Sequence, residues 1–501
     1  MRPLLIGCVA VSLAVTLSAA PANRVQFLSK VYTIDRKYRS MEGPSSVQKI
    51  YLGDLEKPEL LWIVGIRTEM VGEDGETPQL AELMCHVNVD LDPARHQALF
   101  DFGRPVAARL MTLSQGMLSA TLPVGFGFPI ASNEPLLLFT QVLNHNIEHP
   151  DNLKVRHRVT FEYVRDRDLA QPMKPLFNVG ASGMVQLDNN PLALASMMPG
   201  HDGEHAASCL IGSRAPNATA SAADYVDPSG RHMTGHWVVP PGRQTNASDI
   251  TWFMNLPYDT KLHYAAVHLH PFAESLSIRD VTTGETVLKS QAKNPAAGVG
   301  LTHVDTFASV PGMPMRKNHK YELVSVYNNT SSGTADSMAS VFLGFDDPEF
   351  IKPSAAGLAK RSATLDSDTI VMRTSAGDLS ATLDRSAAPN TVIQVARLLL
   401  GGAFDNTSAI NNGSDLRLAI PVTERVRNLL QPLAGDRGGP IERGAVMYCP
   451  PPELGLRIIL KAAAPYDNRC TAFARMAASP EIMNAIATAP SGTAISVKRI
   501  D

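Results

Sequence analysis

Residues 264–275 read YAAVHLHPFAES and place His268 and His270 one residue apart in a run that otherwise resembles a buried strand. In an extended strand, alternate side chains lie on the same face, so the two imidazoles project the same way, about 6–7 Å apart. One ion can bridge such a pair, and imidazole is a common ligand of copper and zinc. The alternative is that both histidines are polar residues on the solvent-facing side of a strand.

Short alternating runs fill the chain on both sides of this stretch, from about residue 25 to 350. Examples are LLWIVGIRTEM (60–70), HRVTFEYV (157–164) and KYELVSVYNN (320–329). Pro, Gly, Asn and Asp separate these runs, which predicts a mainly β chain built from antiparallel sandwiches rather than a parallel sheet. The segment is too long for one sandwich, so we predict two, over residues 23–175 and 176–350.

The composition is that of an ordinary globular protein with several domains. The 501 residues are 44% hydrophobic and 19% charged, with a formal net charge of −3. Long basic runs are missing from the sequence, which excludes nucleic acid as a partner. The sequence also lacks the G-x-S-x-G, H-E-x-x-H, C-x-x-C and phosphate-binding loop motifs of several large enzyme classes.

Beyond residue 350 the pattern changes. Residues 351–365 are rich in small side chains and predict a linker, and 366–501 read as a separate α+β domain. Its first elements are a hairpin with a turn at 376–378 and a helix for which Asn390 is the candidate N-cap and Gly401-Gly402 the stop.

The first 22 residues, MRPLLIGCVAVSLAVTLSAAPA, are typical of a secretory signal peptide with an A-x-A cleavage site after Ala22. The alternative is a membrane anchor, but the apolar run is shorter than the ~20 residues that a span needs. No later segment has the length and apolarity of a span. We therefore expect a secreted or periplasmic protein with no integral membrane segment once the signal is removed.

Removal of the signal leaves four cysteines, which favours disulfides in an exported chain. We favour the pairs Cys85–Cys209, within the β-sandwich part of the chain, and Cys449–Cys470, within the C-terminal domain, although the sequence leaves the connectivity open.

The stretch VHLHPFAESLSIRDVTTGETVLKS (267–290) combines the H-x-H strand with a following hairpin. A later stretch, ADSMASVFLGF (335–345), places Asp336 and Met338 ahead of a hydrophobic strand. Together these features resemble the copper-binding half of the copper type II, ascorbate-dependent monooxygenases, the family of the peptidylglycine α-hydroxylating and dopamine β-monooxygenases. The resemblance covers residues 25–350 and implies that His268, His270 and Met338 bind the copper that activates oxygen. Two imidazoles and a soft thioether suit Cu(I).

The family's second, electron-storing copper is held by three histidines in the N-terminal half, and here the chain departs from the pattern. Cys85-His86 stands where the family has two adjacent histidines, and Leu143 stands where it has the third, with His145 two positions on. The resemblance therefore implies either a reduced site through His86 and His145 or the loss of this copper. A packed histidine is the alternative for each residue.

Residues 371–410, with the Ala-Pro-x-Thr-Val start of a helix and a Gly-Ala-Phe-Asp turn, resemble the opening of a cyclophilin, a peptidyl-prolyl isomerase, and the resemblance extends over 366–495. It implies a β-barrel with helices. The catalytic positions differ, because Ile410 ends the segment that carries Phe-His-Arg in cyclophilins, and Arg457 is the one candidate donor and lies on another strand. We therefore expect a degenerate barrel with a role in packing or partner recognition.

The resemblances imply an exported copper protein that hydroxylates a C–H bond of a small-molecule or peptide substrate, using O2 and a reductant such as ascorbate. The first alternative is a catalytically inactive protein that binds a metal or a protein partner. The second is a prolyl isomerase acting through the C-terminal domain.

Overall fold

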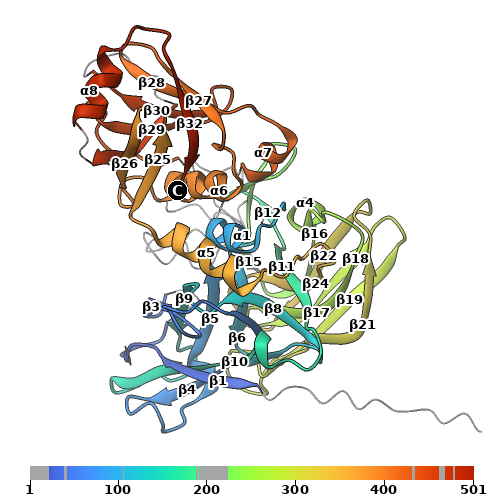
Figure 1. The fold of residues 1–501 in the computed structure, drawn as a ribbon. Coiled ribbons are helices and arrows are strands. Elements are labelled where there is room, and N and C mark those ends of the chain that lie inside the picture. Colours follow the sequence, from blue (N-terminus) through green and yellow to red (C-terminus); the bar gives the residue numbers. More distant parts are fainter. Residues whose placement is uncertain are drawn as a thin grey trace, which may run out of the picture.

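The computed structural model describes residues 22–38, 42–104, 106–187, 190, 224–430, 435–461, 469–477 and 480–501. Residues 1–21 of the predicted signal peptide, and Cys209, lie outside these ranges. The described chain is mainly β, as predicted, and we divide it into an N-terminal region (22–173), a middle region (174–353) and a C-terminal barrel (369–501) (Figure 1).

One ten-stranded sheet runs through both the N-terminal and the middle region. Its order is β1-β10-β4-β8-β11-β24-β17-β21, with β2 beside β10 and β7 beside β4. The strands are β1 (Asn23–Leu28), β2 (Tyr32–Ile34), β4 (Leu60–Gly72), β7 (Ser119–Thr121), β8 (Phe126–Ala131), β10 (Leu153–Arg165), β11 (Lys174–Ser182), β17 (Thr260–Leu269), β21 (Phe307–Met315) and β24 (Ala339–Asp346).

Strand β11 joins the two regions. It pairs in parallel with β8 through Lys174 and Pro175, and antiparallel with β24 from Leu176 to Ser182. The predicted boundary at residue 175 therefore falls at the beginning of the strand that connects the regions. A single hydrophobic core also includes buried residues of both, among them Phe128 and Phe345.

Smaller sheets complete these regions. A four-stranded sheet has the order β3-β9-β5-β6, a five-stranded sheet the order β16-β22-β18-β19-β20, and two short sheets the orders β12-β14-β13 and β15-β23. Their strands are β3 (Ser45–Ile50), β5 (Met84–Leu91), β6 (Arg109–Ser114), β9 (Leu136–Val142), β12 (Val185–Gln186), β13 (Asp224–Val226), β14 (His232–Thr234), β15 (Trp237–Val239), β16 (Gly242–Asp249), β18 (Ala273–Asp280), β19 (Glu285–Lys293), β20 (His303–Val304), β22 (Tyr321–Asn329) and β23 (Ala335–Ser337).

Short helical segments lie between these strands: η1 (Ala81–Leu83), α1 (Pro93–Phe100), η2 (Asp166–Asp168) and α4 (Thr251–Met254). The hairpin predicted after the H-x-H strand is confirmed as β18–β19. The arrangement as two separate sandwiches stays a prediction.

The C-terminal region is a closed barrel of eight strands in the order β25-β26-β31-β29-β30-β28-β27-β32. They are β25 (Thr369–Thr374), β26 (Gly377–Leu383), β27 (Thr407–Asn411), β28 (Asp415–Ala419), β29 (Ala445–Cys449), β30 (Gly455–Ile459), β31 (Thr471–Ala477) and β32 (Ala494–Ile500). The barrel helices are α6 (Pro389–Leu400), α7 (Glu424–Leu429) and α8 (Pro480–Thr488). The predicted β-barrel with helices is therefore present.

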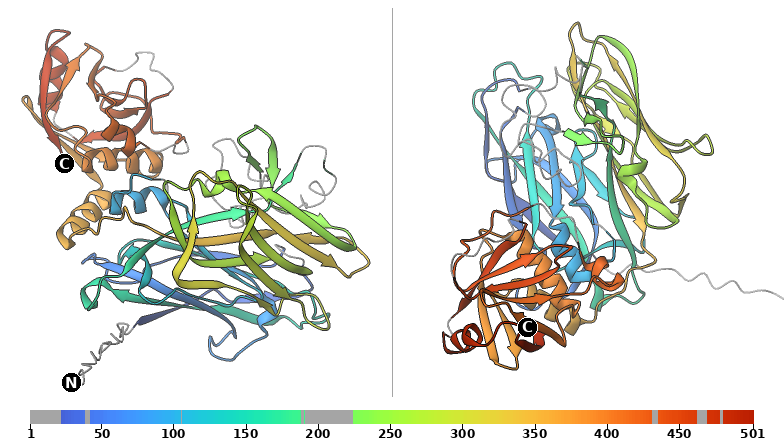
Figure 2. Two further views of the ribbon diagram at one scale, coloured as in Figure 1. Left: turned by 90° about the vertical axis from the view of Figure 1, so that its right-hand side faces the viewer. Right: turned by 90° about the horizontal axis from the view of Figure 1, so that it is seen from above.

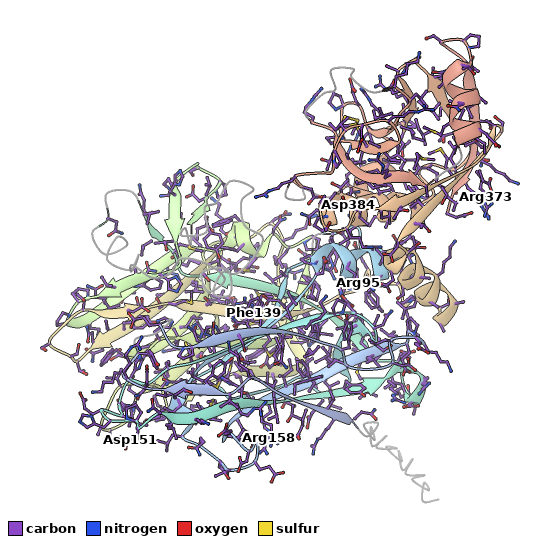
Figure 3. The ribbon with its side chains drawn as sticks, turned by 90° about the vertical axis from the view of Figure 1, so that its left-hand side faces the viewer. Arg95, Phe139, Asp151, Arg158, Arg373 and Asp384 are labelled. Atoms are coloured by element: carbon purple, nitrogen blue, oxygen red, sulfur yellow. A yellow bond between two sulfur atoms is a disulfide. The ribbon has the colours of Figure 1, made fainter. Side chains whose placement is uncertain are left out.

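The predicted linker at 351–365 contains a helix, α5 (Ala355–Asp366), which packs beside α1 and α6 where the barrel meets the N-terminal region (Figure 2). Leu358 and Leu365 of α5 are buried in one cluster with Leu99 and Phe100 of α1. Arg95, which Figure 3 places at this junction, binds the Asp366 carboxylate through two hydrogen bonds of 2.8 and 3.1 Å. The barrel is thus docked by apolar packing and an ion pair.

Candidate metal centre

The H-x-H pair lies at the end of β17, as the sequence predicts. His268 is inside the strand and His270 follows its last residue. Their side chains are nearly fully buried, with residue exposures of 7% and 4%, and their ring centroids are 5.3 Å apart with the planes almost perpendicular. This burial rules out the alternative of a solvent-facing polar pair.

The strand register brings Met338 beside His270. Strand β17 pairs antiparallel with β24, and the last partners are Leu269 and Ala339. His270 and Met338 are the next residues of the chain beyond this last pair, directly outside the two strands. Met338 is buried at 5% exposure. The three residues predicted to bind copper are therefore all buried and lie at the same end of the β17–β24 pair.

A tyrosine hydroxyl ties the backbones of these two residues together. The Tyr327 hydroxyl accepts a hydrogen bond of 3.3 Å from the backbone N–H of His270 and donates one to the carbonyl of Met338. Tyr327 itself is buried, and burial raises the pKa of its hydroxyl above the usual range. The sequence holds no signal that would have assigned this role to Tyr327.

Two further residues reach the pair from the β15–β23 ribbon. The Oδ2 atom of Asp336, on β23, lies 3.0 Å from the Nδ1 atom of His270. The ring of His236, directly before β15, has its centroid 6.3 Å from that of His270. The position of Asp336 two residues before Met338 was visible in the sequence, but its contact with His270 was not.

His86 and His145, predicted for a second copper, both lie in the N-terminal region. His86 is buried on β5, opposite Ser114 of β6, and its Nδ1 atom lies 3.3 Å from the Cys85 Sγ atom. His145 follows β9, and its buried Nδ1 atom has no hydrogen-bond partner.

Electrostatics show that these two pairs are neighbours. Burial, followed by the positive charges of His270 and His86, lowers the pKa of His268 well below its usual value. Burial and the charge of His270 lower the pKa of His145 to about 4. His86 is therefore within electrostatic range of His268, and His145 within range of His270, which the sequence did not predict.

Strand β6 of the N-terminal region packs against β11, β17 and β24 of the middle region. In the middle region, Ser182 of β11 is opposite Ser340 of β24, which is opposite His268 of β17. The Oγ atoms of the two serines lie 2.7 Å apart. His268 thus has hydroxyl groups beside it on its own sheet.

A loop of the middle region is hydrogen-bonded to the N-terminal region next to His145. The Asn146 side chain accepts a bond of 2.8 Å from the N–H of Val299 and donates one of 3.1 Å to its carbonyl. The N–H of Leu301 donates to Gln115 Oε1 at 3.2 Å. We call these contacts the 299–301 latch. They hold the two regions together where the histidines meet.

The residues present suit a metal held by two imidazoles and a thioether. The buried Nδ1 atom of His268 has no hydrogen-bond partner, and an orphaned buried nitrogen of this kind calls for a ligand or a water. Within the described residues, no three His, Cys, Asp or Glu side chains are grouped so that they could hold a metal ion. A metal at His268 and His270 would therefore need the sulfur of Met338 as its third protein ligand.

In the barrel, the two positions that the resemblance identified as degenerate lie in one cross-strand row. Ile410 of β27 is opposite Arg417 of β28, which is opposite Arg457 of β30. Ile410 is partly exposed. Arg457 makes an ion pair with Glu453, whose carboxylate also lies 3.6 Å from Arg417. The guanidinium of Arg457 is therefore occupied by a carboxylate.

The predicted Cys449–Cys470 disulfide is present and joins the end of β29 to the residue before β31. It fits an extracellular or periplasmic location. Cys85 is buried, and its predicted partner, Cys209, lies outside the described residues, so that pairing stays a prediction. Within the described part of the chain, no helix is both long and apolar enough to span a bilayer.

No protein-family model matches the sequence, and no curated protein does either. Solved structures show limited similarity. A cyclophilin-type peptidyl-prolyl isomerase of Cryptosporidium parvum is 19% identical over 26% of this chain and 96% of its own, with a TM-score of 0.22. Cyclophilin AquaCyp293 from Hirschia baltica is 10% identical over 27% of this chain and 73% of its own, with a TM-score of 0.20.

A larger share of the chain is covered by PNGase F, a glycosylasparaginase from Flavobacterium meningosepticum. It is 8% identical over 66% of this chain and 98% of its own, with a TM-score of 0.28. The solved structures similar to the chain thus include cyclophilin-type isomerases over about a quarter of its length, and the comparisons give no support to the copper monooxygenase resemblance. At such identities and TM-scores they indicate nothing about activity.

Proposed function

We propose that this chain is an exported copper-binding protein of monooxygenase type, with a copper site formed by His268, His270 and Met338. The observation that supports the proposal is the pairing of β17 with β24, which ends at Leu269 and Ala339, directly beside the buried residues His270 and Met338. Two imidazoles and a thioether are a donor set that favours Cu(I). Bound copper would supply the redox chemistry with O2, with ascorbate as a possible reductant.

The surroundings of the three residues favour metal binding in two ways, through the protonation state of His268 and the position of the His270 backbone. A metal binds imidazole in its neutral form, and burial keeps His268 neutral at physiological pH by lowering its pKa. Tyr327 fixes the backbone of His270 relative to that of Met338. His86 and His145, in the N-terminal region, remain the candidates for a second, weaker site. The substrate, a small molecule or a peptide, would carry the C–H bond to be hydroxylated.

The test is the copper content per chain of the purified protein after copper loading, in the wild type and in His268→Ala. His303→Ala is the matched control, because His303 is a half-exposed histidine on β20 of the same region. We expect one bound copper in the wild type and in the control, and none in His268→Ala. A fall from two to one would show that His86 and His145 form a second site. No copper in the wild type would refute the proposal.

An inactive metal- or partner-binding protein is the first alternative, and it is favoured if copper binds but ascorbate is not consumed under O2. Prolyl isomerisation by the barrel is the second. The ion pair of Arg457 with Glu453 disfavours it, because a donor to the prolyl amide must be available to the peptide. An isomerisation assay with the whole protein and a prolyl tetrapeptide separates this alternative from the others.

A further inference from the structure

Asp336 is held in place on both sides. It is the central residue of β23 and pairs with Val238 of β15. The next residue, Ser337, donates a hydrogen bond of 2.8 Å from its hydroxyl to the carbonyl of Trp237. The short β15–β23 ribbon thus carries the carboxylate to His270 on an ordered backbone rather than on a loop.

The carboxylate meets only one nitrogen of the His270 ring. Its Oδ2 atom lies 3.0 Å from Nδ1, and the two side chains are 28% and 4% exposed. This distance is short enough for a hydrogen bond, but the two groups are not aligned for one, and the buried Nδ1 atom has no hydrogen-bond partner. Such contacts often tighten when a ligand binds the ring.

The Asp336 carboxylate determines which nitrogen of the neutral His270 ring carries the proton. A neutral ring has one N–H and one lone pair, and a carboxylate near one nitrogen holds the proton there. With the proton on Nδ1, the lone pair is on Nε2, on the opposite side of the ring. A carboxylate in this place also makes the ring a stronger metal ligand and fixes its orientation.

The neighbouring histidine has no such partner. The Nδ1 atom of His268 is buried without a hydrogen bond, and the residue opposite it on β24 is Ser340, whose hydroxyl contacts that of Ser182. The two imidazoles of the pair are therefore not equivalent, since the orientation of only one is set by a charged group.

We infer that Asp336 is a positioning residue that holds the His270 ring with Nε2 directed to the copper ion. The inference rests on the proposed copper site and deepens it. It assigns to Asp336 a role in metal affinity and ligand geometry without direct contact with the metal.

The experiment measures the Cu(I) affinity of the whole protein by competition with a chromophoric chelator, together with the electron paramagnetic resonance spectrum of the Cu(II) form. The variants are Asp336→Ala, Asp336→Asn and Asp336→Glu. Asp305→Ala is the matched control, because Asp305 also lies 2.9 Å from a histidine nitrogen, that of His303, and neither residue belongs to the proposed copper site. Circular dichroism and the thermal midpoint show that each variant is folded.

We expect Asp336→Ala to weaken Cu(I) binding about 10–100-fold and to change the Cu(II) hyperfine splitting. Asp336→Asn, which keeps the shape but not the charge, should fall between it and the wild type, and Asp336→Glu should recover part of the loss. The control should bind as the wild type does. A merely structural role would lower the thermal midpoint without changing the spectrum.

Wild-type affinity and spectrum in Asp336→Ala or Asp336→Asn, with copper lost in His268→Ala, would overturn the role of Asp336 and leave the copper site standing. A spectrum unchanged in every variant would overturn it as well. A wild type that binds no copper would overturn both proposals together.

Discussion

His157 lies on β10 with its side chain completely buried, and its ring meets the edge of Tyr32. Its Nε2 atom lies 3.1 Å from the carbonyl of Gln141, and its Nδ1 atom has no hydrogen-bond partner. Burial lowers the pKa of His157 to about 4. The folded protein therefore keeps this ring neutral at a pH where the unfolded chain protonates it.

This difference makes stability depend on pH. Above the unfolded pKa of about 6.5 the ring is neutral in both states, and the full stability is present. As the pH falls from 6.5 towards 4, the unfolded chain takes up the proton first, and the free energy of unfolding decreases. We expect His157 to account for a loss of about 2–3 kcal/mol between pH 7 and pH 4.5. Urea unfolding at the two pH values measures it.

In His157→Asn the difference between the two pH values should shrink by that amount. His149→Asn is the control, because His149 is exposed and should leave the difference unchanged. An equal pH dependence in wild type and His157→Asn would show that His157 is protonated in the folded state.

Two buried tyrosines give a matched pair of tests. Tyr327→Phe removes the hydroxyl that serves the His270 N–H and the Met338 carbonyl, and leaving these buried groups without a partner should cost about 1–3 kcal/mol. Tyr264→Phe removes a buried hydroxyl that has no hydrogen-bond partner, so it should be neutral or stabilising. Unfolding in urea compares them. Equal losses would contradict the hydrogen-bonding role of Tyr327.

At the level of single residues, the two-residue period of a strand predicted that His268 and His270 share a face, and the resemblance alone implied Met338. The partners that complete the site were not predictable. Tyr327 and Asp336 reach His270 through the pairing of β22 with β18 and of β23 with β15. Such pairings join strands far apart in the chain, and no local pattern specifies them.

Among the elements, α5 is a helix in the segment that its small residues predict to be a linker. The small residues of 351–365 predicted a linker, but an alanine-rich segment also favours a helix. The Ser354 hydroxyl accepts a bond of 3.0 Å from the Gly357 N–H and caps it. Leu358, Ser362 and Leu365 then lie on one buried face at helical spacing. The heptad-like spacing of these three residues was visible in the sequence.

The cap at the start of α6 could not be predicted from the local sequence. Asn390 was the predicted N-cap, but the N-cap residue is Ala388, whose side chain cannot cap. The Asp436 carboxylate accepts a bond of 2.7 Å from the Thr391 N–H instead. This cap comes from a residue more than 40 positions away in the chain and depends on the barrel being closed.

The 299–301 latch is an element-scale feature with a measurable effect. Asn146→Ala removes both hydrogen bonds to the Val299 backbone, and we expect faster amide hydrogen exchange at residues 299–301. The amides of β4 should exchange as before and serve as an internal control. Unchanged exchange at Val299 would mean that packing alone holds this loop.

The Cys449–Cys470 disulfide closes a loop with a sequence separation of 21 residues. Replacing both cysteines by serine should lower the stability of the barrel by about 3 kcal/mol, because the unfolded chain regains the entropy of the open loop. Thermal unfolding with and without a reductant checks this value. A reductant that destabilises the wild type but not the double variant is the expected pattern.

For the whole molecule, the docking of the barrel depends on the buried face of α5. Leu365→Asp places a charge in the cluster that α5 shares with α1, and should release the barrel and raise the radius of gyration measured by small-angle X-ray scattering. Ala359→Asp, on the exposed side of the same helix, is the control. An unchanged radius of gyration in Leu365→Asp would show that the polar contacts of α5, Arg95–Asp366 and Arg361–Asp101, suffice for docking.

The separate C-terminal domain could be predicted, because the alternating apolar runs of the first 350 residues give way there to a small-residue segment and a helical stretch. The sheet that continues from the N-terminal into the middle region could not be predicted. It depends on the parallel pairing of β8 with β11, two strands whose alternation would equally suit the edges of separate sheets.

That pairing also decides how the protein can be divided in the laboratory. A recombinant fragment ending near residue 173 would leave β8 with an unpaired edge, and one beginning near 174 would do the same for β11. Open edges of this kind pair with other chains and promote aggregation. The usable fragments are therefore expected to be two, with the cut placed beyond residue 350, and a gene dissected at the apparent boundary should yield insoluble halves.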